Sequence, residues 1–95
     1  MDVIDLKTIV CKRKQGLLVS ELGNELVMMD IDQGNYIGLN ETGRAIWELL
    51  EEPISVEQLI EKLICSYEID IDQCTGDTLE YLNKMNEQQL LSISN

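Results

Sequence analysis

Two turns divide residues 17–40 into three short strand-like segments, and this arrangement constrains the fold more than any other feature of the chain. LLVSEL (17–22) and ELVMMDI (25–31) flank Gly23-Asn24, a pair with the chemistry of a two-residue hairpin turn. NYIGLN (35–40) follows a second turn that contains Gly34, a residue free to adopt a positive φ. The three segments predict an antiparallel meander, which is stable only when other elements cover one of its faces.

Three amphipathic helices are predicted after the meander. Asn40 suits the N-cap of the first helix, whose apolar side includes Trp47. Ser55 and Gln58 form an S-x-x-Q capping box at the start of the second, and its apolar stripe reaches Tyr67 at 3,4 spacing. The fold class is therefore α+β: a winged helix-turn-helix-like domain with a three-stranded antiparallel meander followed by three helices.

The third helix is expected from about Gln73 to Met85, with Asp72 or Thr75 as its cap. Leu79 and Leu82 form a narrow core-like stripe on it. A second, semi-polar stripe lies beside the first and consists of Cys74, Thr78, Tyr81 and Met85. Two interpretations remain open: the helix is wedged between neighbours, or it forms one side of a groove.

The charge of the chain argues against nucleic acid as a partner. The formal net charge is −11, and residues 41–95 carry −9 of it, with Arg44, Lys62 and Lys84 as their basic residues. Because phosphate contacts supply most non-specific affinity for DNA, we predict no nucleic-acid binding despite the winged-helix outline.

No apolar run is long enough to span a membrane, and the acidic N-terminus is unlike a signal peptide. We expect a cytoplasmic protein that does not bind membranes.

The residues that usually carry catalysis are scarce. The chain has no histidine, which excludes a Cys–His nucleophile pair and a mixed Cys/His zinc site. Its three cysteines contain no C-x-x-C pair, and a three-cysteine site completed by a carboxylate is the metal arrangement still open. Asp30 and Asp32 begin a segment with its glycine one position too early for a calcium loop. We predict no catalytic residue, no metal and no cofactor.

Peptide or protein binding is the class that remains. The third segment of a meander has one neighbour in its sheet, so its far edge can accept an incoming strand through backbone groups. Gly38 would ease such an approach. The alternative is that Tyr36 and Gly38 only shape a strand.

A motif spanning the third strand and first helix resembles the PqqD-like family, also called RiPP recognition elements. The motif reads Gly34-x-Tyr36-x-x-Leu39-Asn40-x-x-Gly43-x-x-Ile46-Trp47-x-Leu49-Leu50. Weaker matches follow in order: Ser55-Val56-Glu57-Gln58, Tyr67, and Ile69-Asp70. Gln88-Gln89 departs from the family, which often has a glycine there.

The resemblance implies a protein that binds the leader of a ribosomally made precursor peptide and presents it to a modifying enzyme. We expect the chain to be free-standing, and as an acidic chain of this kind it most resembles the recognition proteins of lasso peptide pathways. Their partners are a transglutaminase-like leader protease and, as a further candidate, a cyclase. A PqqD-type chaperone that serves a radical-SAM enzyme is the second possibility, and a winged-helix DNA-binding regulator, which the charge disfavours, ranks after it. The expected boundaries are an N-terminal arm (1–16), a recognition domain (17–91) and a tail (92–95).

The resemblance also implies a site, in which the leader adds to the third strand and packs against the third helix. Ile37 and Leu39 are expected to face the core and groove, with Val27 or Met29 beside them. The full set of predicted leader-binding residues is Val27, Met29, Asn35, Tyr36, Ile37, Gly38, Leu39, Cys74, Thr78, Tyr81, Leu82 and Met85.

Overall fold

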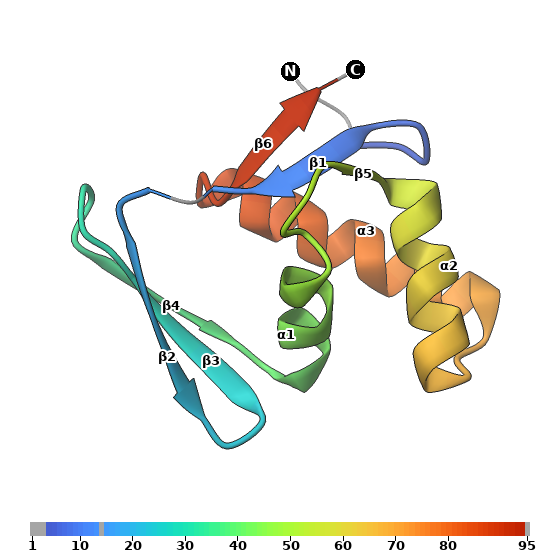
Figure 1. Cartoon of the computed structure of the whole chain (residues 1–95), viewed down its shortest axis with the longest axis horizontal. Helices are drawn as coiled ribbons and strands as arrows, with labels where there is room; N and C mark the ends of the chain where they lie inside the picture. The colour runs from blue at the N-terminus through green and yellow to red at the C-terminus, as the bar shows by residue number, and fades with distance from the viewer. Residues whose placement is uncertain (1–3, 14, 95) are drawn as a thin grey trace.

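The computed structural model describes residues 4–13 and 15–94, which form two small antiparallel sheets and three helices (Figure 1). The first sheet has the strand order β2-β3-β4 and the second has the order β5-β1-β6. In chain order the elements are β1 (Ile9–Lys12), β2 (Leu17–Leu22), β3 (Glu25–Asp30), β4 (Asn35–Leu39), α1 (Glu41–Glu48), β5 (Ile54–Ser55), α2 (Val56–Tyr67), α3 (Ile71–Glu87) and β6 (Leu91–Ser94).

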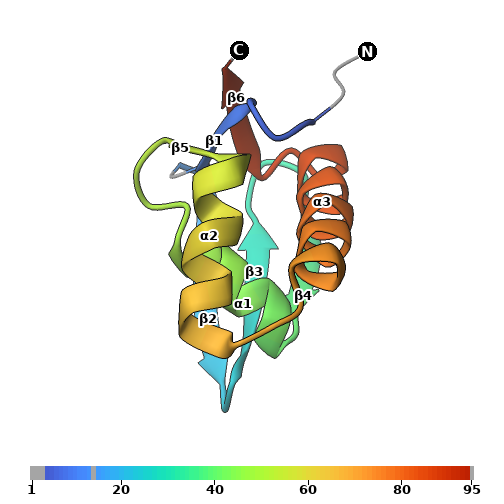
Figure 2. The ribbon, with the colours of Figure 1, turned by 90° about the vertical axis from the view of Figure 1, so that its right-hand side faces the viewer.

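The helices join the two sheets into one body. Helix α1 contacts β3 and β4, whereas α2 contacts β5 and α3 contacts β6. Figure 2 shows α1 between α2 and α3, with the meander behind it. The core lies among these elements, and Met28, Ile46 and Leu59 are among its fully buried side chains.

The predicted meander is confirmed. Strand β2 pairs with β3 from Leu17 opposite Asp30 to Leu22 opposite Glu25, and β3 pairs with β4. The two turns contain glycines in the left-handed region, with φ of 60° at Gly23 and 73° at Gly34. These angles explain why glycine is favoured at both positions.

The starts of α1 and α2 are also confirmed. The Asn40 side chain accepts a hydrogen bond from the Gly43 backbone N–H at 2.9 Å, and the Ser55 hydroxyl accepts one from the Gln58 N–H at 3.2 Å. Each bond satisfies a backbone donor that has no partner within its helix.

The predicted start of α3 is wrong. Asp70 is its N-cap and accepts from the Gln73 N–H at 3.2 Å, so the helix begins at Ile71 and continues to Glu87. Thr75, one of the expected caps, instead donates its hydroxyl to the Ile71 carbonyl at 2.7 Å inside the helix. Ser, Thr and Asp compete as caps along an acidic segment, and sequence alone does not rank them.

The second sheet was not predicted. Residues 9–12, expected in an arm, form its central strand, and residues 91–94, mostly expected in a tail, form an edge strand. The register places Ile9 opposite Ser94 and Lys12 opposite Leu91. Val10 is fully buried there, so both ends of the described chain contribute to the core.

No helix in the described part of the chain is long and apolar enough to cross a bilayer.

Candidate functional site

Strand β4 is an edge of its sheet. Within the described residues it pairs with β3 and with no strand on its other side. Alternate backbone N–H and C=O groups along its outer side therefore face away from the sheet, which is the arrangement that accepts an added strand.

A groove of about 230 Å³ runs beside this edge, between β4 and the C-terminal half of α3. Its lining residues are Tyr36, Ile37, Gly38, Leu39, Tyr81, Lys84, Met85, Glu87 and Gln88. Helix α3 thus packs against the core and also forms one wall of a groove. Both interpretations of its second stripe therefore apply: a helix wedged between neighbours, and a helix that forms one side of a groove.

The side chains of β4 alternate as expected. Ile37 and Leu39 are buried, whereas the Tyr36 side chain is 74% exposed on the opposite face. The expectation that Val27 or Met29 lies beside Ile37 and Leu39 is wrong. The β3–β4 register places Met28 opposite Ile37 and Leu26 opposite Leu39, because it is shifted by one residue from the expected pairing.

The predicted residues of α3 divide between two hollows. Tyr81 and Met85 line the groove beside β4. Cys74 and Thr78 are buried and line a second hollow of about 290 Å³, which is bounded by α1, by the end of α2 and by the start of α3. Leu82 is fully buried in the core and lines neither hollow.

Three lining residues were missed by sequence reasoning. Lys84, Glu87 and Gln88 extend the groove wall beyond Tyr81, and Lys84 Nζ lies 5.9 Å from the centroid of the Tyr81 ring. Residues 81, 84, 85 and 88 follow the helical spacing that marks one face. This spacing would have indicated the additional groove residues, but the predicted helix ended at Met85 instead of Glu87.

The family of the chain follows from comparison with known sequences. The model of the family described as "Coenzyme PQQ synthesis protein D (PqqD)" matches residues 25–91, which contain β3, β4 and all three helices. The chain belongs to the PqqD family.

One solved structure shares both the fold and part of the sequence of this PqqD-family chain. It is described as TbiB1 in complex with the TbiA(beta) leader peptide, and the TM-score is 0.74 at 26% sequence identity. The alignment covers 85% of this chain and 94% of the other. The curated proteins contain no significant match to the sequence.

An ion-paired cluster lies beside the start of β4 in this PqqD-family chain, where Asp30 stands opposite Asn35. Asp30, at the end of β3, is 1% exposed, and its carboxylate is bound by Arg13 through Nη1 at 3.1 Å and Nη2 at 3.2 Å. The hydrogen bond from Arg13 holds the pKa of Asp30 below its ordinary value of 3.8, although burial acts in the opposite direction. Asp32, the other carboxylate of the rejected calcium loop, also binds Arg13, at 3.0 Å.

The outer face of the meander carries a continuous row of apolar side chains. Leu18, Met29 and Tyr36 stand opposite one another across the three strands, and Ser20, Val27 and Gly38 form the next row. Leu18 is 57% exposed and Val27 and Met29 are half-buried, so this face has no covering element among the described residues.

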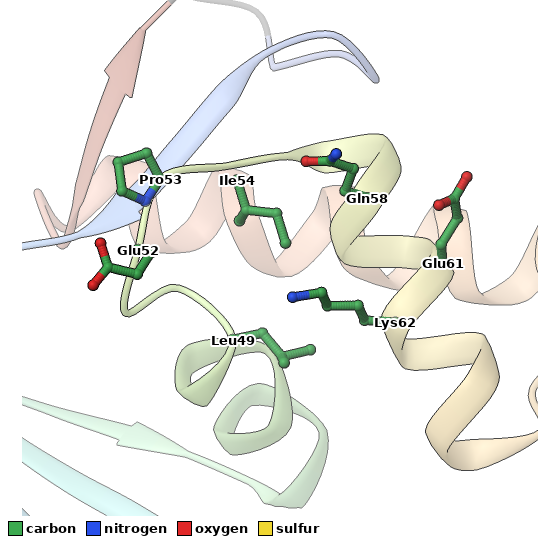
Figure 3. A pocket seen from close by; sticks show the side chains of 7 residues that line it. All are labelled: Leu49, Glu52, Pro53, Ile54, Gln58, Glu61 and Lys62. Atoms are coloured by element: carbon green, nitrogen blue, oxygen red, sulfur yellow. The ribbon is translucent and has the colours of Figure 1, made fainter.

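A third hollow, of about 320 Å³, lies away from the strand edge (Figure 3). It is formed by the segment from α1 to β5 and by α2, and the Lys62 side chain extends between Leu49 and Ile54. None of the predicted site residues lines it.

Proposed function

We propose that this PqqD-family chain is a cytoplasmic, non-catalytic protein that binds the leader segment of a ribosomally made precursor peptide. The leader adds as a strand along β4 and packs its side chains against α3. The observation that carries this proposal is the unpaired edge of β4 beside a groove walled by α3. The TbiB1 structure supports it, because that protein was determined with a leader peptide bound.

The groove supplies apolar contacts, which the backbone hydrogen bonds of strand addition do not provide. A sub-micromolar complex needs about −8 kcal/mol, and ordering a disordered peptide costs roughly 2–5 kcal/mol of the gross interaction. Backbone hydrogen bonds contribute modestly in net terms, so buried apolar contacts must provide the rest. Ile37, Leu39, Tyr81 and Met85 offer such contacts to every second side chain of an added strand.

A scan with backbone-methylated peptides tests strand addition directly. The probes are fluorescein-labelled synthetic peptides with the N-terminal sequences of the short reading frames that flank the gene, and affinity is measured by fluorescence polarisation. N-methylation should abolish binding at alternate positions and be tolerated between them, because every second N–H of an added strand faces β4. Uniform sensitivity, or uniform tolerance, would contradict strand addition.

The pathway is proposed to be that of a lasso peptide, in which the chain presents its bound leader to a transglutaminase-like protease. The outer face of the meander adjoins the leader-binding edge and is open, so we place the protease there. The variants Leu18→Glu and Ser20→Glu should leave leader affinity unchanged and remove the stimulation of leader cleavage. Loss of both properties would place the leader itself on that face.

A second pathway has one observation in its favour. The matched family is described by coenzyme PQQ synthesis, which favours a chaperone that delivers a precursor to a radical-SAM enzyme. The neighbouring reading frames separate the two: a small protease and a cyclase indicate a lasso pathway, and a radical-SAM enzyme indicates the other.

A further inference from the structure

Three segments that are distant in the sequence meet at the end of the groove where β4 begins. They are the end of β1, the turn between β3 and β4, and the residues that follow α3. Arg13 follows β1 directly and contacts the other two segments: it binds Asp30 and Asp32, and its Nη1 donates to the Gln89 carbonyl at 3.3 Å. The Arg13 backbone N–H also donates to the Leu90 carbonyl at 2.7 Å.

We propose that Arg13 is a positioning residue for peptide recognition, which sets the separation between β4 and α3 at this end of the groove. The proposal rests on the function proposed above. Arg13 lies outside residues 25–91, the part of the chain that matches the family model.

Arg13 acts on the β4 wall through the Asp30 carboxylate. The Asp30 carboxylate that Arg13 binds also accepts backbone hydrogen bonds from Asp32 at 3.1 Å and from Gln33 at 3.2 Å. These bonds shape the turn that leads into β4, whose first residue, Asn35, stands opposite Asp30. Arg13 therefore fixes the start of the strand that would receive the peptide.

Arg13 acts on the α3 wall through the Gln89 carbonyl. The chain leaves α3 through Gln89, which has a positive φ of 61° and whose carbonyl accepts from Arg13. The side chains of Gln33 and Gln89 also join the two walls directly, at 2.7 Å. Both walls are thus tied to one guanidinium group and to one amide pair.

The planar guanidinium group of Arg13 makes these contacts at the same time. Arg13 Nε donates to the Gln15 carbonyl at 2.8 Å, while Nη1 and Nη2 bind the two Asp30 oxygens side by side. A guanidinium group presents five donors in a planar fork, whereas a lysine ammonium group is a point charge with three. Lysine would keep the charge at position 13 but lose the geometry that joins three segments.

The test compares Arg13→Gln and Arg13→Lys with Arg44→Gln. Arg44 is a matched control, since it also binds two carboxylates, Glu21 at 2.6 Å and Glu48 at 3.1 Å, but it does so away from the groove. The measurements are affinity for the labelled synthetic leader, stability to urea, and amide hydrogen exchange of residues 35–39.

Arg13→Gln should lower affinity about tenfold, as expected for losing charge-assisted hydrogen bonds that order the site, while the control binds like the wild type. Arg13→Lys should not restore binding, and amides 35–39 should exchange faster in both Arg13 variants than in the control. Wild-type affinity in Arg13→Gln, or full rescue by lysine, would overturn the proposal.

Two further results keep the test decisive. If Arg13→Gln does not fold, Gln33→Ala replaces it, because this variant removes only the hydrogen bond between the Gln33 and Gln89 side chains. Leader affinity should then fall about twofold, and an unchanged affinity would count against the proposal. If the wild type binds no leader, the proposed function fails. The positioning role of Arg13 is then judged by hydrogen exchange alone, and equal exchange rates of residues 35–39 in Arg13→Gln and in the Arg44→Gln control would refute it.

Discussion

At the scale of single residues, Gly43 shows how a missing side chain shapes the groove. A Cβ at this position in α1 would lie 3.1 Å from Cε1 of Tyr81 and 3.3 Å from the Cβ of Leu39. Glycine in a helix costs about 1 kcal/mol relative to alanine, so the close approach of the Tyr81 ring accounts for its presence.

Gly43→Ala should therefore separate stability from binding. The gain in helix propensity offsets the crowding, and we expect the free energy of unfolding to change by less than about 1 kcal/mol. Leader affinity should fall because the Tyr81 ring is displaced from the groove wall. Urea titration and polarisation on the same protein give both values, and unchanged affinity would show that the ring position is unimportant.

Tyr81 and Leu82 are neighbours in the sequence but have different roles, since Tyr81 lines the groove and Leu82 lies in the core. Tyr81→Ala should weaken leader binding by more than about 1 kcal/mol, the level that marks a contributing contact. Leu82 is fully buried, so Leu82→Ala should instead cost about 2–5 kcal/mol of folding stability. Polarisation and urea titration of each variant distinguish the two roles, and unchanged leader affinity in Tyr81→Ala would remove that residue from the site.

Asp30 gives the protein a predictable response to acid. Its pKa is lower in the folded protein than in the unfolded chain, chiefly because Arg13 donates hydrogen bonds to it. The stability that this carboxylate contributes is therefore fully present above about pH 4 and is lost as the pH falls through the folded pKa. The stability difference between the wild type and Asp30→Asn should shrink below pH 4 in urea titrations, and a difference independent of pH would contradict this assignment.

At the scale of elements, the two sheets differ in how far the sequence predicts them. The meander is local, and glycines at positions 23 and 34 mark its turns. The sheet formed by β5, β1 and β6 has strands of two to four residues, and it joins residues about forty-five positions apart in β1 and β5 and about eighty apart in β1 and β6. Such short segments carry little periodicity, and pairing over that distance leaves no local signal.

The same difference applies to the site. The edge strand and Tyr81 and Met85 of the groove were predictable, since strand order and helical spacing are read from the sequence. The register of β3 was not, because a shift of one residue exchanges the two faces without changing the composition of the strand. The cluster around Arg13 could not be predicted either, as it depends on β1, whose position follows from the second sheet.

Removal of β6 should reveal how much this second sheet contributes. A chain that ends at Leu90 loses the partner strand of β1 and exposes Val10, which is fully buried. Burial of one aliphatic side chain contributes about 1.5–3 kcal/mol, and we expect a stability loss of at least that size. Urea titration measures it, and a loss below about 0.5 kcal/mol, the usual size of a surface effect, would show that β6 is dispensable.

At the scale of the whole molecule, negative charge dominates the surface. The net charge is −11, because acidic residues far outnumber basic ones. Four of the basic residues are paired with acidic side chains: Lys12, Arg13, Arg44 and Lys84. A surface of this kind raises the encounter rate of a basic partner, and salt screens the effect. The association rate of a basic leader should fall with ionic strength while its dissociation rate changes little. Stopped-flow fluorescence at low and high salt measures both, and a salt-independent association rate would exclude electrostatic steering.

The pairing of β1 with β6 places Ile9 directly opposite Ser94. In Figure 1 strand β6 ends on the side of the molecule that points away from the meander. A tether or fused domain that follows β6 would therefore leave the outer edge of β4 uncovered. The same proximity makes the chain suitable for circular permutation, with a short linker across the old ends and a new opening at the Gly23-Asn24 turn. Such a permutant could be inserted within an enzyme, with both connections at the Gly23-Asn24 turn.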